Sequence, residues 1–117
     1  MEINFENLYN YLIQGLGVDK TLSFQQIRII FVQALDDYFN SKINVETLST
    51  LADNLVTKVG YKESDFSPDL NIALQAGYEL EWYSKNKKDN EETLNEWLED
   101  LKTFYQENKD LLKNFKK

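Results

Sequence analysis

Apolar residues recur at intervals of three and four along almost the whole chain, and no segment alternates apolar and polar residues with a period of two. This spacing places apolar side chains on one face of a helix, whereas a half-buried strand requires strict alternation. The sequence therefore predicts an all-α fold. The connections between the apolar stripes are short enough for antiparallel neighbours, so the predicted architecture is an antiparallel helical bundle.

Five helices are expected from these stripes and from the residues that begin and end them. They cover about residues 4–16, 24–40, 45–59, 68–83 and 91–114. Gly60 supplies the stop of the third helix, while Ser67 and Pro68 open the fourth. Asp89 or Asn90 is expected to cap the last helix after the polar segment SKNKKDN. A chain of 117 residues is long enough for one core, which predicts a single helical-bundle domain over 1–117.

The residue types that most enzymes use are missing. The chain contains neither cysteine nor histidine, so it has no thiolate and lacks the commonest general base and metal ligand. A magnesium site built from carboxylates is the remaining enzymatic alternative, and Glu96, Glu99, Glu107 and Asp110 form suitably spaced pairs. Both pairs lie on the same predicted helix with lysines between them, so a solvated helix face explains them better. We expect no catalytic residue, no metal site and no cofactor.

The apolar runs and the cysteine content of the sequence bear on localisation. No run of residues approaches the ~20 consecutive apolar residues that span a bilayer, and the N-terminal MEINFENLYN is acidic without a long apolar stretch. The absence of cysteine fits a reducing compartment. We expect a cytoplasmic protein that does not associate with membranes.

Negative charge is concentrated in the first two thirds of the chain. Residues 1–40 carry 5 acidic and 2 basic side chains, residues 41–81 carry 7 and 3, and residues 82–117 carry 8 and 8. From Glu63 to Glu81 there is no lysine or arginine among the acids. Such a local field repels nucleic acid and anionic membranes and attracts a basic partner. Solubility explains the acidic composition equally well, so both interpretations stay open at this point.

The predicted fourth helix has an apolar face with a glycine near its centre. At about 100° per residue, Leu70, Leu74 and Leu80 share one sector with Gly77. Glycine inside a helix costs about 1 kcal/mol relative to alanine, and a close helix crossing offsets that cost. We therefore expect Gly77 to serve packing.

The opposite sector of this helix places Tyr78 and Trp82 among the polar residues Asn71, Gln75 and Glu79. Tyrosine and tryptophan on a polar face are typical of binding surfaces, because they supply contact area at low entropic cost. Alternatively, another helix such as the first covers this side and makes both aromatic residues part of the core. The sequence supports the two interpretations equally.

Two segments resemble a known family. They are YFNSKINVETLSTLADNLV (38–56) and GYKESDFSPDLNIALQAGYELEW (60–82). Their Ser-Lys-Ile turn at 41–43, the Ser67-Pro68 helix start, Gly77 and the Glu-Leu pair at 79–80 resemble, in order and approximate spacing, the immunity proteins of the colicin D type. The likeness covers roughly residues 30–105.

The resemblance implies a function and a binding surface. It implies an antiparallel four-helix bundle, to which this chain adds an N-terminal helix, that binds the basic nuclease domain of a bacterial toxin cutting transfer RNA. Acidic groups would stand in for RNA phosphates over the toxin's active site, in a 1:1 complex of a monomer without direct nucleic-acid contact. With the two aromatic anchors included, the predicted partner-binding residues are Glu63, Asp65, Asp69, Tyr78, Glu79 and Trp82.

This chain departs from the family in its additional N-terminal helix and in a longer last helix balanced by lysines. Neither the cognate toxin nor the contact set follows from the likeness. An acidic mimic of nucleic acid, or a helical protein-interaction module unrelated to toxins, is the alternative function.

Overall fold

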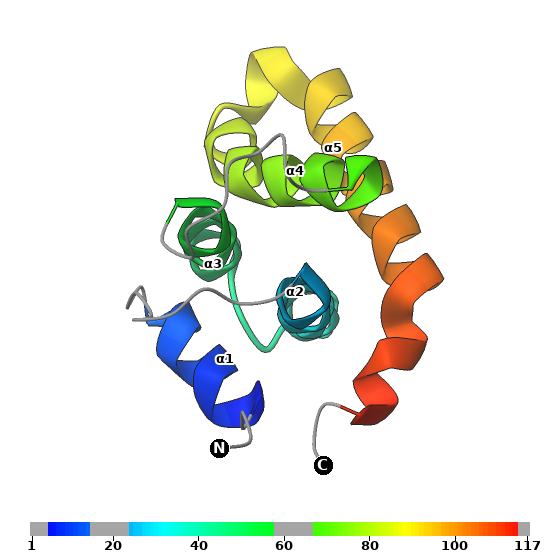
Figure 1. Cartoon of the computed structure of the whole chain (residues 1–117). Coiled ribbons are helices and arrows are strands. Elements are labelled where there is room, and N and C mark those ends of the chain that lie inside the picture. Colours follow the sequence, from blue (N-terminus) through cyan, green and yellow to red (C-terminus); the bar gives the residue numbers. More distant parts are fainter. Residues whose placement is uncertain (1–4, 15–23, 58–66, 115–117) are drawn as a thin grey trace.

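Figure 1 shows the computed structural model, which describes residues 5–14, 24–57 and 67–114. The helices within these ranges are α1 (Phe5–Ile13), α2 (Phe24–Phe39), α3 (Val45–Thr57), α4 (Pro68–Lys85), α5 (Lys87–Asn108) and the 3-10 helix η2 (Lys109–Asn114). The described ranges contain no strand. The predicted all-α class is therefore confirmed.

Helix α2 lies at the centre of the molecule. Figure 1 shows α2 and α3 end-on, α4 running across the page above both, and α5 descending beside α2. The buried apolar residues of α2 point in several directions around the helix: Ile27, Ile29, Ile30, Phe31, Val32, Ala34 and Leu35. Because α4 crosses α2 and α3 steeply, the antiparallel four-helix bundle stays a prediction.

Helices α3 and α4 pack closely at Gly77. A Cβ atom added at Gly77 would lie 2.8 Å from Cζ of Phe31 and 3.3 Å from Cβ of Ala52, so a larger residue requires its neighbours to move. The buried Ser49 hydroxyl donates to the carbonyl oxygen of Gly77 at 2.8 Å and accepts from the backbone N–H of Glu81 at 3.3 Å. The expected packing role of Gly77 is confirmed, and this hydroxyl adds a polar link between the two helices.

The polar segment at 84–90 contains the junction of α4 and α5, but much of it is helical, which the sequence did not predict. Helix α4 continues to Lys85, and α5 begins at Lys87 after the single residue Asn86. Asn90 has non-helical angles inside α5 (φ −133°, ψ 19°), and its side-chain amide donates to the carbonyl oxygen of Asn86 at 2.8 Å. Asn90 thus marks a kink at the position where the sequence predicted the cap of the long last helix. The helical residues that precede the kink from Lys87 were not predicted, and they form because lysine is a good helix former.

Two carboxylates near the end of α2 accept hydrogen bonds from tyrosines on other helices. Tyr9 Oη donates to Asp37 Oδ2 at 2.7 Å, and Tyr105 Oη donates to Asp36 Oδ1 at 2.5 Å. These bonds connect α1 and α5 to the central helix.

Among the described residues, no helix combines the length and the hydropathy that a membrane span requires.

The tyrosine hydrogen bonds predict a lower free energy of unfolding at alkaline pH. The hydrogen bond to Asp36, with partial desolvation, raises the pKa of Tyr105 from its usual 10 to about 12. The folded state therefore holds the phenol proton more tightly, so this stabilisation is complete below pH 10 and is lost as the pH rises towards 12. We expect the free energy of unfolding, measured by urea titration from pH 8 to 12, to decline less steeply in Tyr105→Phe. Tyr11→Phe, at a largely exposed tyrosine, is the control, and identical slopes in all three proteins would contradict the assignment.

Candidate functional site

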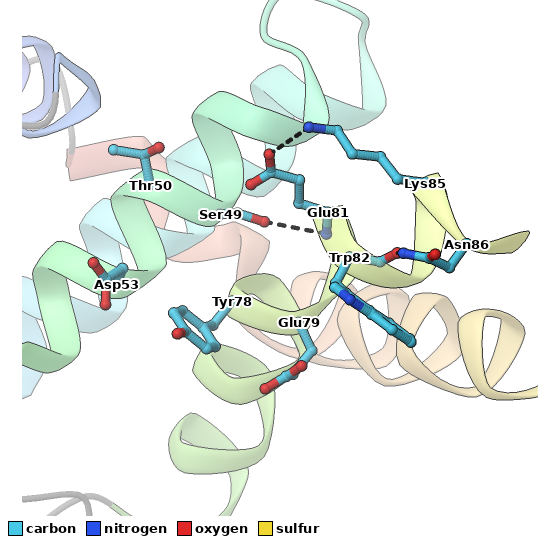
Figure 2. A pocket seen from close by; sticks show the side chains of 9 residues that line it. All are labelled: Ser49, Thr50, Asp53, Tyr78, Glu79, Glu81, Trp82, Lys85 and Asn86. Carbon is cyan, nitrogen blue, oxygen red and sulfur yellow. Dashed lines mark hydrogen bonds and ion pairs between the residues drawn. The ribbon is translucent and has the colours of Figure 1, made fainter. Parts of the chain in front are cut away.

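A groove of about 560 Å³ lies between α3 and α4 (Figure 2). Ser49, Thr50 and Asp53 line it from α3, and Tyr78, Glu79, Glu81, Trp82, Lys85 and Asn86 line it from α4 and the residue that follows. Three of these side chains are carboxylates and one is a cation. The described lining of the groove therefore has a net negative charge.

The helix crossing decides which residues of α4 border the groove. Gly77 faces α3 and the core, and successive residues turn by about 100° around a helix. Tyr78 and Trp82 are thereby rotated away from the core, while Glu81 stays near the contact with α3, where its backbone N–H meets Ser49. Because Gly77 faces the core, Tyr78 and Trp82 lie at the edge of the groove.

Tyr78 and Trp82 are the most exposed large apolar side chains of the described residues, at 50% and 54% of their full accessibility. The Trp82 ring packs edge-on against Tyr83 with ring centroids 4.9 Å apart, which supports one side of the indole and leaves much of the rest open. Helix α1 lies on the other side of α3 from α4 in Figure 1. No other helix within the described ranges buries both aromatic residues, so that alternative does not hold for them.

In the described part of the chain, one ammonium group lies among the carboxylates at one end of the groove. Lys85 Nζ is 2.8 Å from Glu81 Oε1 and 3.7 Å from Glu46 Oε1, so it joins the last turn of α4 to the first turn of α3. Figure 2 shows Lys85 reaching back over Glu81 towards α3. Glu79 forms no ion pair with any residue in the described ranges.

Asp69 has an internal partner at the other end of α4. Its carboxylate accepts two hydrogen bonds from the Arg28 guanidinium, at 2.7 and 3.1 Å. The Ser67 hydroxyl donates to Asp69 at 2.8 Å and accepts from Arg28 at 3.0 Å, so Ser67 occupies the N-cap position without a side-chain capping bond. The Arg28 bonds hold the pKa of Asp69 well below its usual range. The guanidinium also lies over the Phe104 ring, 5.4 Å from its centroid.

The structure thus brings together three of the six predicted partner-binding residues. Tyr78, Glu79 and Trp82 share the α3–α4 groove, whereas Asp69 lies about 14 Å from Tyr78 along the helix axis. Glu63 and Asp65 lie outside the described residues. A role of Asp69 in partner binding stays a prediction, and the structure gives it a role in joining α4 to α2.

Sequence reasoning missed the contribution of α3 to the groove. Thr50 and Asp53 are three residues apart and therefore share one helix face, which is the signal that was available. Nothing in the local sequence indicates that this face lies beside Tyr78 of α4. The position of Glu81 at the edge of the apolar sector is visible in the sequence, but its ion pair with Lys85 depends on α4 continuing to Lys85, inside the predicted break at 84–90.

Within the described ranges, no group of three or more acidic side chains is close enough to hold a metal ion. Comparisons with protein-family models, curated proteins and solved structures found no match. The described structure therefore defines an all-α protein with an acidic groove bordered by two exposed aromatic side chains.

Proposed function

We propose that this protein is an immunity protein that binds and inhibits a cognate bacterial toxin nuclease, a ribonuclease that cleaves transfer RNA. The groove between α3 and α4 covers the basic active site of the toxin. The observation that carries the proposal is the pairing of half-exposed Tyr78 and Trp82 with an acidic groove on one side of the molecule. The sequence resemblance, which includes Gly77 and the Glu-Leu pair at 79–80, supports the same function.

Such an inhibitor works by binding alone. Carboxylates held on two packed helices are preorganised for a basic cleft, and their field accelerates association in a manner that salt suppresses. Buried aromatic anchors slow dissociation, because their contact area is lost only when the complex opens. The proposal comprises a monomer acting in the cytoplasm in a 1:1 complex, without cofactor, nucleic acid or membrane. The family's antiparallel four-helix bundle remains part of the expectation.

Coexpression with the nuclease domain encoded beside this protein tests the function. We expect the two proteins to copurify in equal amounts and the growth of cells expressing the nuclease to be rescued. Copurification with a different nucleic-acid-binding protein would favour the acidic mimic. Concentration-dependent sedimentation of the isolated chain would instead favour a self-associating module, and growth arrest despite soluble expression would overturn the proposal.

Reversing the charge of Glu79 tests the binding face. Glu79→Lys places a cation in the groove opposite a basic partner, and we expect the dissociation constant of the nuclease complex to rise about tenfold at low salt. The rise should shrink as salt screens the interaction. Glu99→Lys is the matched control, because Glu99 is an exposed acid on α5 outside the groove. Equal effects of the two changes would indicate that only the overall charge matters.

A further inference from the structure

Among the described residues, Lys85 is the only cation that lines the α3–α4 groove, and it is held by carboxylates of two helices. Its Nζ lies 2.8 Å from Glu81 and 3.7 Å from Glu46. The Lys85 side chain is 58% exposed, and the two acids are 34% and 48% exposed. The ammonium therefore lies in the solvent-facing part of the groove and not in the core, so it can leave without opening the protein.

The ion pair can be replaced because its effect is local and its groups are exposed. Glutamate four residues before lysine is a favourable order on a helix, and a cation suits the last turn, so the pair stabilises the end of α4 locally. Exposed pairs of this kind contribute little to folding, because water solvates both groups after they separate. A stronger donor from a partner can therefore take the place of Lys85.

The neighbouring residues suit an arginine better than a second lysine. A guanidinium can donate two parallel hydrogen bonds to one carboxylate, whereas an ammonium acts as a point charge. A guanidinium also stacks on aromatic rings, and Tyr78 and Trp82 border the same groove about half-exposed. Two further acids that line the groove, Asp53 and Glu79, add to the negative field around the entering cation.

We propose that Lys85 is an internal placeholder for an arginine side chain of the partner. The arginine enters the groove beside Tyr78 and Trp82 and takes over Glu81 and Glu46, and Lys85 turns out to solvent. In the free protein Lys85 neutralises this end of the groove and lowers its affinity for cations that lack the aromatic contacts. The inference rests on the proposed function, since it concerns how the same groove selects its partner.

An arginine peptide tests the inference without the toxin. We suggest titrating hexa-arginine, acetylated and amidated at its ends, into the full chain at low salt by calorimetry. Lys85→Met keeps an unbranched apolar side chain and removes the competing charge, so we expect about three- to fivefold tighter binding. Lys102→Met is the matched control, because Lys102 is an exposed lysine that lines a different groove. This control should change the affinity less than twofold.

A second pair of variants identifies the carboxylate involved. Glu81→Gln should weaken hexa-arginine binding, and in Glu81→Gln/Lys85→Met the gain from losing Lys85 should disappear. Hexa-lysine should bind the parent more weakly than hexa-arginine. Circular dichroism melting of each variant verifies that the helices are intact.

Three results would overturn the inference: equal tightening in Lys85→Met and Lys102→Met, weaker binding in Lys85→Met, or no binding of hexa-arginine to either the parent or Lys85→Met. Each leaves the test of the proposed function intact, because copurification with the nuclease can succeed through other contacts. Conversely, tighter peptide binding in Lys85→Met without copurification would leave an arginine site whose partner is not the nuclease.

Discussion

Replacing Trp82 with alanine should weaken the complex with the nuclease domain about thirtyfold, which corresponds to about 2 kcal/mol. The indole is 54% exposed and is supported on one side by Tyr83, so it can bury a large area against a partner without rearranging first. Tryptophan is among the residues that most often dominate binding energy for this reason. Isothermal titration calorimetry gives the affinity, and thermal melting should show little change in stability because the side chain contributes little to the core.

The control for this prediction lies on the same helix. Ile72 is 49% exposed and borders a separate hollow with Asp100 and Phe104, away from the α3–α4 groove. Ile72→Ala should therefore leave the affinity within about twofold of the parent. If Ile72→Ala weakens the complex and Trp82→Ala does not, the partner binds the side of α4 that faces α5 instead.

Replacing Gly77 with valine should lower the free energy of unfolding by about 3 kcal/mol, although valine is the better helix former. The added Cβ would lie 2.8 Å from Cζ of Phe31. Phe31 is fully buried, and its ring packs against Phe104 with centroids 6.0 Å apart, so it cannot move aside freely. The new side chain must push α4 away from α2 and α3, which also changes the shape of the groove. Urea unfolding at neutral pH measures the effect.

A double-mutant cycle separates crowding from helix propensity. Phe31→Leu shortens the side chain that meets the new Cβ, so Gly77→Val should cost less in that background, with a coupling of about 1 kcal/mol or more. Strictly additive costs would mean that the glycine is required for a reason other than its contact with Phe31.

Much of α4 follows from its sequence because a helix imposes its own geometry. Ser67-Pro68 marks the start, and the three- and four-residue spacing predicts that Leu70, Leu74 and Leu80 are buried, which the structure confirms. The same geometry places Tyr78, Glu79 and Trp82 away from the core. These properties depend on residues close together in the chain, so the sequence contains all the information they need.

The residues that contact each face of α4 come from distant parts of the chain. Asp69 looks like one more free acid in the sequence, but Arg28, 41 residues earlier, takes both of its oxygens. The α3 side of the groove and the ammonium between Glu46 and Glu81 are equally invisible to local patterns. Rules based on neighbouring residues cannot decide which distant residues pair, because many arrangements of the same helices bury a similar apolar area.

The sequence by itself determined that the chain is helical, that Gly77 faces the core, and that two aromatic residues occupy the polar side of α4. Only the tertiary structure decided that those residues stay exposed, that α3 supplies the other wall of the groove, and that Asp69 is bound internally. The physical reason is that helix formation and amphipathicity follow from spacing within one segment. Exposure, charge pairing and groove shape instead follow from how closely two helices approach, and here that approach depends on a glycine, a buried serine and the phenylalanine ring beside them.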